Sequence, residues 1–470
     1  MKQSFKKKYI FNNIFLKIFI LFFCIYLFSL KTSNNILRKK KRKNLNCLIE
    51  LDPIYSFNMR LKSEPFILCK SDNSLHICYK NNMTYYWEKN GILCLMNNFI
   101  INPSYWKEDG FTFKGPINRR TRGSPLISKG FFNMECNQQN KIKKYNKIYK
   151  TYLDSWNYDL KNINQNISDF FPDKTIFIIS RNQDSPNLFH GGSEFINAFS
   201  IMKLLNINPK NIQILFLESM KFNEDPYYDL YKNVISGGNE PIHIRDIKNN
   251  IQIKNAVHIP INWDSPCFTK CRIPKCKYPS LTYIKLYKNV LRYMNIRKFV
   301  DSLTYNKEIF YYPKSVHNPN SNKYKKIITF EWRRPWPKER KHQHRLLGNG
   351  PELVDKLSNK LPKNILIRLV DTARLSYYQQ ISIMQNTDYL LGIHGAGLFL
   401  SIFLPAHAIV HEIKHENKMN NLQILSILSG HKCYSDQIKS YVKSIDLNKY
   451  IFFNPNDLAK KIKLHLKNIK

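Results

Sequence analysis

Acidic residues are scarce in this sequence: 34 Asp and Glu stand against 74 Lys and Arg, a net charge of +40 over 470 residues. Such an excess ordinarily indicates binding to nucleic acid or to an anionic surface. The basic residues are spread over the whole chain, however, and are not confined to one face or arm. We interpret most of this charge as a solvated surface and expect no nucleic-acid partner. A polybasic membrane-surface or nucleic-acid-binding protein remains an alternative for which charge is the sole argument.

A cleavage signal is also lacking. No small-x-small pair follows the apolar stretch Tyr9–Leu30, although lysines precede it and it is long enough to cross a bilayer. We predict an uncleaved anchor at residues 9–30, with a cytoplasmic tail at 1–8 and a stem at 31–46. A cleaved signal peptide is the competing interpretation, and Lys31 together with the basic run Arg38–Lys43 leaves the orientation less strongly determined. We interpret that run as a membrane-proximal spacer.

Cysteines are few for the length, ten in all, and Cys24 lies in the predicted anchor. The others are Cys47, Cys69, Cys78, Cys94, Cys136, Cys267, Cys271, Cys276 and Cys433. Their spread fits a few disulfides formed in an oxidising compartment, and their odd number leaves at least one thiol without an intramolecular partner. The triplet at 267–276 lacks a fourth ligand at suitable spacing, so disulfides are favoured there over zinc, and no metal-binding residues are predicted. Asn82 and Asn166 are glycosylation acceptors if the chain is lumenal.

The 43% of hydrophobic and 14% of aromatic residues exclude a disordered chain and suffice for two domains. Buried-strand runs alternate with helical patterns twice, first from Lys174 and again from Lys326. We predict an α/β protein with two Rossmann-like lobes and a cleft between them, an N-terminal lobe at 47–315 and a C-terminal lobe at 316–470. The segment Phe310–Tyr324, rich in Pro, Asn and Ser, is the predicted linker.

The most informative segment is Asp388–Ile413, DYLLGIHGAGLFLSIFLPAHAIVHEI. A buried strand, Tyr389–Ile393, ends at the turn His394–Gly397; a helical run, Leu398–Leu404, and a second strand follow. Glycines at the carboxyl end of a strand let the backbone approach a ligand, and the next helix presents free N–H groups, so the turn suits a diphosphate. The alternative is that the glycines serve only to pack helix against strand.

The string NTDYLLGIHGAGLFLSIFLPAHAIVHEI resembles the signature of glycosyltransferase family 61. The matching residues are Asn386, Thr387, Asp388, Gly392, His394, Gly395, Ala396, Gly397, Leu398, Phe403, Leu404, Pro405 and Glu412. The resemblance is strong over 327–413, modest around 187–194 and absent before Phe171. It implies a GT-B-like architecture, and ligands in such sheets bind beyond the carboxyl ends of the strands.

Transfer from a nucleotide sugar requires that the departing diphosphate be stabilised, by a metal on an Asp-x-Asp motif or by basic groups. The sequence has no Asp-x-Asp motif, which favours the metal-free solution without a cofactor. Arg333 and Arg334 follow a predicted strand, and Arg345 matches a second basic position of the family. By themselves, these arginines would more often be surface charge; their place in the matched region favours a donor site.

Other residues complete the predicted donor site. His394 lies in the turn and is expected to donate a hydrogen bond to phosphate, while Glu412 is expected to accept from ribose hydroxyls. The alternatives are a structural histidine and an edge-strand surface carboxylate. Asp371 and Gln380 match further family positions and are assigned supporting roles.

The acceptor base is sought in the other lobe. Asn187–Glu194, NLFHGGSE, resembles a family element that ends in Asp, so this chain has a longer carboxylate arm. His190 and Glu194 stand one helical turn apart, and either is a candidate base, with Asn187 in support. The alternative is a helix-capping pair on the surface.

Together these features predict an inverting glycosyltransferase that moves GlcNAc or xylose from a UDP-sugar to a hydroxyl of a glycoprotein or glycan acceptor. The predicted location is the Golgi or endoplasmic reticulum membrane, with single-pass type II topology and a lumenal catalytic part. The alternative is a non-catalytic carbohydrate- or nucleotide-binding relative of the same fold. The Glu194 substitution and the Gly191–Gly192 pair leave room for it.

Overall fold

The computed structural model describes residues 65–80, 92–107, 126–139, 154–159, 167–180, 188–217, 225–259, 280–294, 309–335, 345–414, 421–445 and 448–467, with a few positions in 52–62 and Tyr152. The predicted anchor, the cytoplasmic tail and the stem lie outside these residues. So do Asn82, Asn166 and Asn187 and the cysteine triplet at 267–276. Among the described helices, none combines the length and the apolar character that crossing a membrane requires.

The larger sheet forms the core of the N-terminal half. Its main strands are β1 (Phe66–Lys70), β2 (Leu75–Lys80), β3 (Ile92–Ile101), β7 (Gln138–Gln139), β10 (Thr175–Ile179), β11 (Ile212–Phe216), β12 (Ile242–His243) and β13 (Ile251–Ile259), in the order β12-β11-β10-β13-β3-β2-β1-β7. The first four are parallel and the rest pair antiparallel. Short strands extend it or pair beside it: β4 (Trp106–Lys107), β5 (Leu126–Ile127), β6 (Phe132–Asn133), β8 (Trp156–Asn157) and β9 (Ser168–Asp169).

The second sheet forms the core of the C-terminal half. Its strands are β14 (Phe310–Tyr311), β15 (Lys326–Glu331), β17 (Ile365–Val370), β18 (Tyr389–Ile393), β19 (Ile409–Lys414) and β20 (Lys432–Gln437), in the order β14-β17-β15-β18-β19-β20. All pairs are parallel except β14 with β17. A small sheet of β16 (Leu346–Leu347), β21 (Ser440–Ile445) and β22 (Asn448–Phe453) lies beside it.

Helices connect the strands of both sheets. They are η1 (Pro103–Tyr105), α5 (Leu188–Leu204), η2 (Pro209–Asn211), α6 (Tyr228–Leu230), the π-helix η4 (Tyr231–Ile235), η5 (Ile244–Asp246), α7 (Leu281–Met294), α9 (Gly350–Lys360), η9 (Thr372–Arg374), α10 (Tyr377–Gln385), the 3-10 helix η10 (Ala396–Phe403), α11 (Asn421–Leu428) and α12 (Pro455–Lys467). The start of α10 is fixed by a capping box, in which the Ser376 side chain accepts from the Gln379 backbone N–H and the Gln379 side chain accepts from the Ser376 backbone N–H.

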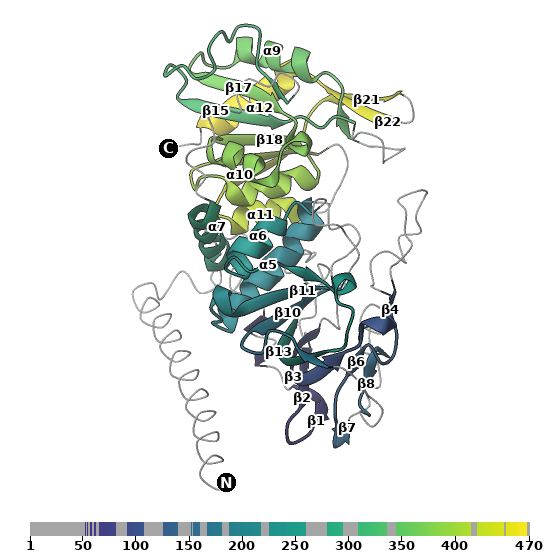
Figure 1. The fold of residues 1–470 in the computed structure, drawn as a ribbon. Helices are drawn as coiled ribbons and strands as arrows, with labels where there is room; N and C mark the ends of the chain where they lie inside the picture. Colours follow the sequence, from purple (N-terminus) through teal and green to yellow (C-terminus); the bar gives the residue numbers. More distant parts are fainter. Residues whose placement is uncertain are drawn as a thin grey trace.

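The two halves share one hydrophobic core. Figure 1 shows the sheets at opposite ends of the molecule with α5, α6, α7, α10 and α11 stacked between them. A single cluster of buried side chains includes Phe195 and Phe199 of α5 together with Phe399 of η10 and Leu425 of α11. Because this shared layer is apolar, burial of its surface holds the N-terminal helices against those that follow the C-terminal strands.

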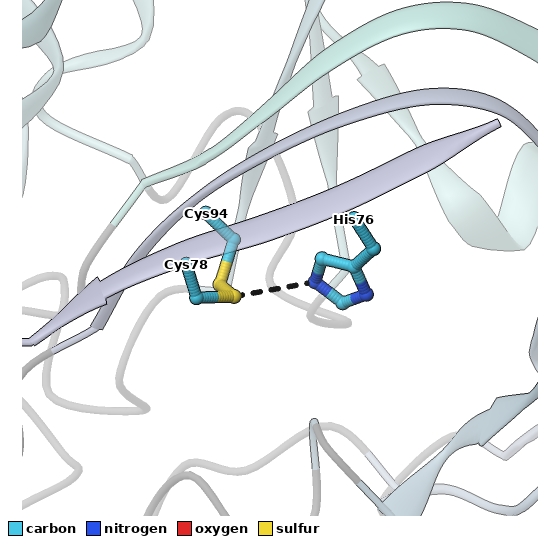
Figure 2. Close-up of side chains that lie close together, drawn as sticks. All are labelled: His76, Cys78 and Cys94. Atoms are coloured by element: carbon cyan, nitrogen blue, oxygen red, sulfur yellow. Dashed lines mark hydrogen bonds between the residues drawn. A yellow bond between two sulfur atoms is a disulfide. The ribbon is translucent and has the colours of Figure 1, made fainter. Parts of the chain in front are cut away.

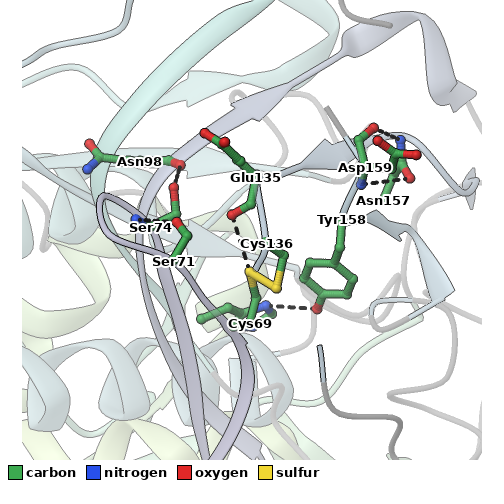
Figure 3. Close-up of a disulfide and its surroundings, with 10 residues drawn as sticks. Cys69, Ser71, Ser74, Asn98, Glu135, Cys136, Asn157, Tyr158 and Asp159 are labelled. Atoms are coloured by element: carbon green, nitrogen blue, oxygen red, sulfur yellow. Dashed lines mark hydrogen bonds between the residues drawn. A yellow bond between two sulfur atoms is a disulfide. The ribbon is translucent and has the colours of Figure 1, made fainter. Parts of the chain in front are cut away.

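Two disulfides tie the edge of the N-terminal sheet. Cys78 and Cys94 face each other on the neighbouring strands β2 and β3, and His76 lies beside them (Figure 2). Cys69 joins Cys136 near Tyr158 (Figure 3). Cys433 is a free thiol, and burial raises its pKa.

The α/β class and most predicted elements are confirmed. The apolar runs Ile365–Val370 and Tyr389–Ile393 predict two strands, and β17 and β18 have these ranges. Helical spacing predicts a helix over Glu194–Leu205, and α5 begins six residues earlier, at Leu188. The predicted helix after the glycine turn is a 3-10 helix. No strand was predicted after Ile413, yet β20, β21 and β22 follow it. The lobe boundary at 315/316 stays a prediction; β14, on its N-terminal side, pairs with the C-terminal sheet.

Candidate functional site

The candidate site lies where the C-terminal sheet reverses its winding. Numbered along the chain, its five parallel strands have the order 2-1-3-4-5, with β15 first and β18 third. In doubly wound sheets with this order, ligands bind beyond the carboxyl ends of the two strands at which the order reverses. Glu331 ends β15 and is followed by Arg333, while His394 directly follows β18.

Two arginines converge on the glycine turn. Arg345 Nη1 donates to the carbonyl oxygen of His394 at 2.6 Å, and Arg333 Nη1 approaches the same oxygen at 3.5 Å. Arg345 adopts φ +66°, a left-handed conformation that costs a non-glycine residue about 1–3 kcal/mol. The structure thus concentrates two permanent positive charges beside one turn.

The glycines of the turn are explained by the side chains beside them. A Cβ at Gly395 would lie 1.8 Å from Arg333 Nη1, and a Cβ at Gly397 would lie 1.6 Å from Glu331 Oε1. Gly395 itself has extended backbone, so space and not φ requires glycine there. Gly395 therefore leaves space for the guanidinium of Arg333, and Gly397 leaves space for the carboxyl group of Glu331. The alternative that the glycines serve only to pack helix against strand does not account for these two contacts.

Glu331 is a site residue that the sequence analysis missed. It is 9% exposed, and its buried Oε2 atom has no hydrogen-bond partner among the residues that the structure describes. Burial raises its pKa to about 7, with Asp371 contributing in the same direction and Arg333 and Arg345 opposing the shift. A carboxyl group that titrates near neutrality can be a hydrogen-bond donor or an anion there. Its position at the end of a strand, two residues before Arg333, was the available signal.

His394 and Glu412 form a pair across neighbouring strands. Nδ1 of His394 contacts Glu412 Oε1, and Glu412 Oε2 accepts from Ser435 Oγ at 3.1 Å and lies 3.8 Å from Lys414 Nζ. Glu412 is 1% exposed, so the alternative of an edge-strand surface carboxylate is wrong. A carboxylate on Nδ1 fixes the ring so that Nε2 is the nitrogen left to meet a ligand.

Arg334 and Asp371 form a separate ion pair. Arg334 Nη2 lies 2.7 Å from Asp371 Oδ2, its guanidinium lies over the ring of Trp332, and Arg374 also contacts Asp371. Gln380 donates to the carbonyl oxygen of Leu375 at 3.0 Å in α10. Arg333 and Arg345 therefore lie together at the turn, whereas Arg334 pairs with Asp371 and Gln380 supports the backbone.

The matched Asn-Thr-Asp triplet has a structural role. Thr387 Oγ1 lies 2.7 Å from Thr329 Oγ1, and Asp388 Oδ2 accepts from the backbone N–H of Ile327 at 2.8 Å. Asn386 donates to the carbonyl oxygen of Ser382. These bonds fix β18 against β15 at the ends opposite the glycine turn.

The candidate base residues lie on a helix that packs against the turn. α5 carries His190 and Glu194 and contacts η10; a Cβ at Gly192 would lie 2.2 Å from the ring of Phe399. Gly192 is thus required by this packing. Glu194 is 1% exposed, so the alternative of a capping pair on the surface is wrong for it.

Metal-ligating residues gather elsewhere. Within the described residues, two groups of His, Cys and Asp could hold an ion, and neither includes a residue of the glycine turn. One of them, His76 with Cys78 and Cys94, has both sulfurs engaged in a disulfide (Figure 2). The arginines and the histidine of the turn suit an anion with several oxygens, as a diphosphate is.

Residues 251–411 match the family model described as Glycosyltransferase 61. The chain is similar to the EGF domain-specific O-linked N-acetylglucosamine transferase of Drosophila melanogaster, with 33% identity over 91 residues, 19% of this chain and 17% of the relative. The Mus musculus protein of the same name is 38% identical over 76 residues, 16% of this chain and 14% of the relative. The chain thus matches less than a fifth of the length of these relatives.

Proposed function

Because residues 251–411 are a glycosyltransferase 61 domain, we propose that the chain is an inverting glycosyltransferase of GT-B architecture. It moves a sugar from a UDP-sugar to a hydroxyl of a protein or glycan acceptor and forms a β-linkage. The strand orders of the two sheets and the helices between them support this architecture. UDP-GlcNAc and UDP-xylose are the candidate donors, and the names of the relatives favour UDP-GlcNAc and a protein acceptor.

The observation that carries the proposal is the convergence of Arg333 and Arg345 on the turn at His394. As the sugar leaves, negative charge develops on the diphosphate, and two fixed guanidinium groups stabilise it without having to reorganise. The backbone N–H groups at the start of η10 add to this charge stabilisation. In this proposal a metal is not needed for transfer, consistent with the absence of an Asp-x-Asp motif.

The acceptor side is assigned to α5. Glu194 or His190 takes the proton from the acceptor hydroxyl, the acceptor oxygen attacks the anomeric carbon, and the bond from that carbon to the β-phosphate oxygen breaks. UDP leaves with the electron pair. The direct contact of α5 with η10 supports this assignment, because it places the helix that carries the base next to the donor turn.

We assign the protein to the Golgi or endoplasmic reticulum membrane, with single-pass type II topology and a lumenal catalytic part. The disulfides Cys69–Cys136 and Cys78–Cys94 support an oxidising compartment. Endoglycosidase sensitivity of the expressed chain tests the topology, since glycans at Asn82 or Asn166 require lumenal exposure.

A non-catalytic binder of the same fold is the second candidate. The observation that favours it is the burial of Glu194, since a general base must reach its substrate. UDP release from a panel of UDP-sugars, with and without acceptor glycoproteins, separates the two. Turnover that is lost in Arg333→Ala and kept in Lys356→Ala, which removes an exposed charge on α9, supports the enzyme. UDP binding without turnover on any donor supports the binder.

A further inference from the structure

A second polar cluster lies in the C-terminal lobe, apart from the glycine turn. It consists of His411 on β19, Asp436 on β20 and His465 on α12. His411 and His465 are almost fully buried, and Asp436 is mostly buried. Burying polar or charged side chains costs free energy unless they are hydrogen-bonded, ion-paired or bound to a metal. The burial of these three side chains therefore requires such an interaction.

The ligand atoms converge on one point. Asp436 Oδ2 lies 3.2 Å from His411 Nε2 and 3.1 Å from His465 Nε2, and the three atoms all lie within 4.8 Å of one another. His411 Nε2 and Asp436 Oδ2 are buried, and within the described residues their contacts are the ion-pair contacts inside this group, without a hydrogen bond of good geometry. A tetrahedral zinc ion with bonds of about 2.0–2.2 Å holds its ligand atoms roughly 3.3–3.6 Å apart, close to these separations.

The surroundings fix the ring orientations that a metal requires. Tyr389 Oη lies 2.9 Å from Nδ1 of His411 and 2.8 Å from Nδ1 of His465. When both Nδ1–H groups donate to this oxygen, both Nε2 lone pairs point at the common centre. Metal-binding histidines are oriented by such a partner on the other ring nitrogen, and Lys461 likewise donates to Asp436 Oδ1 at 3.1 Å.

An arrangement without a metal is less consistent with these contacts. Both Nε2 atoms would then carry the protons directed at Asp436. The single proton of Tyr389 could satisfy only one Nδ1, so the other ring would have to be a buried cation, with Asp436 as the shared counter-ion of that ring and Lys461. An ion between the three atoms removes this conflict.

We propose that His411, Asp436 and His465 form a zinc site, completed by a water molecule. Two imidazole nitrogens and one carboxylate oxygen are a ligand set that zinc takes in proteins. The ion would join the C-terminal helix α12 to β19 and β20. Strand alternation places His411 and Glu412 on opposite faces of β19, so this site lies on the face away from the donor turn.

The metal content of the full-length chain, purified in detergent, tests the proposal. After incubation with zinc and extensive dialysis, elemental analysis is expected to find about one zinc ion per chain in wild type and in His407→Asn. His407 is an exposed histidine of the same lobe and is the matched control. His465→Asn is expected to lose the zinc. Wild type without bound zinc, or equal zinc in both variants, would overturn the site.

Two further measurements cover the case in which His465→Asn fails to fold. Tyr389→Phe keeps the ring in the core and removes only the oxygen, so zinc affinity is expected to fall about 10–100-fold. Cobalt bound to wild type is expected to show the intense visible absorption of tetrahedral coordination. An unchanged affinity in Tyr389→Phe, or a weak octahedral spectrum, would contradict the proposed geometry.

Discussion

Replacing Glu331 with Gln tests the most unusual group of the candidate site. The substitution preserves the shape of a buried side chain beside Gly392 and Gly397 and removes its ability to ionise. In wild type, burial raises the pKa of Glu331 to about 7 from an ordinary value of 4.5. The carboxyl is therefore protonated in the folded protein at pH 5 and ionised at pH 8.

The effect on stability follows from this shift. Folded Glu331 binds its proton more tightly than the unfolded chain does, so the stabilisation is fully present below about pH 4.5. This stabilisation is lost progressively as the pH rises from about 4.5 through the folded-state pKa of about 7. One pKa unit corresponds to 1.36 kcal/mol, and the shift amounts to about 3 kcal/mol at most. The Gln variant lacks this term, so we expect it to gain up to about 3 kcal/mol relative to wild type between pH 5 and pH 8.

Thermal unfolding at pH 5 and pH 8 measures the difference. We expect the Tm of Glu331→Gln relative to wild type to be higher at pH 8 than at pH 5, by roughly 5 °C or more for a domain of this size. Glu352→Gln is the matched control, because Glu352 is exposed and its ion pair among the described residues is with Lys356 on the same helix, α9. Taking the difference between variants cancels the titration of every other group.

Binding of UDP gives a second readout. Ionised Glu331 at about 10 Å from a phosphate charge would oppose binding by about 1–2 kcal/mol at an effective dielectric constant of about 20. Wild-type affinity is then expected to fall about tenfold more than that of Glu331→Gln between pH 6 and pH 8, since the ionisation of UDP itself is common to both. Parallel pH profiles of the two proteins, in Tm and in UDP affinity, would refute the assignment of Glu331 to the donor site.

Three other substitutions separate the parts of the proposed site. Arg345→Gly relieves a left-handed residue but also removes the hydrogen bond to the His394 carbonyl, so the two effects on stability oppose each other. UDP binding should weaken at least about tenfold, measured by calorimetry. Gly397→Ala places a Cβ 1.6 Å from Glu331 Oε1 and should weaken UDP binding, a result that unchanged affinity would contradict. Gly192→Ala forces α5 away from Phe399 and should lower turnover about tenfold while UDP affinity stays within twofold of wild type. If turnover and UDP affinity fell by the same factor, α5 would not act on the acceptor alone.

The parallel core was predictable because its strands are short apolar runs bounded by polar turns. In β17, for example, Leu366, Ile367 and Leu369 are apolar and buried, and the strand matches its predicted range. The strands β20–β22 were not predicted because polar and apolar residues do not alternate regularly along them. β21 is mostly exposed, so it has no buried face that hydrophobic periodicity could reveal.

The donor site was partly predictable for a related reason. Arg333, Arg345 and His394 could be named from a family pattern, and the structure brings them together. Glu331 was missed, although it ends a strand two residues before Arg333, because a carboxylate at a proposed anion site contradicts simple charge matching. Only its position against Gly397 reveals that the turn is shaped around it.

The proposed zinc site changes how metal-free transfer must be tested. Because His411 and Glu412 are consecutive on β19, removal of zinc from one face would disturb the strand that holds His394 on the other. Loss of UDP release in EDTA is therefore expected to follow a fall in Tm and to be restored by zinc together with the Tm. Mg²⁺ or Mn²⁺ should restore neither. If either ion restored turnover of EDTA-treated protein without changing its Tm, a divalent metal would act on the departing diphosphate, and the role given to Arg333 and Arg345 would be wrong.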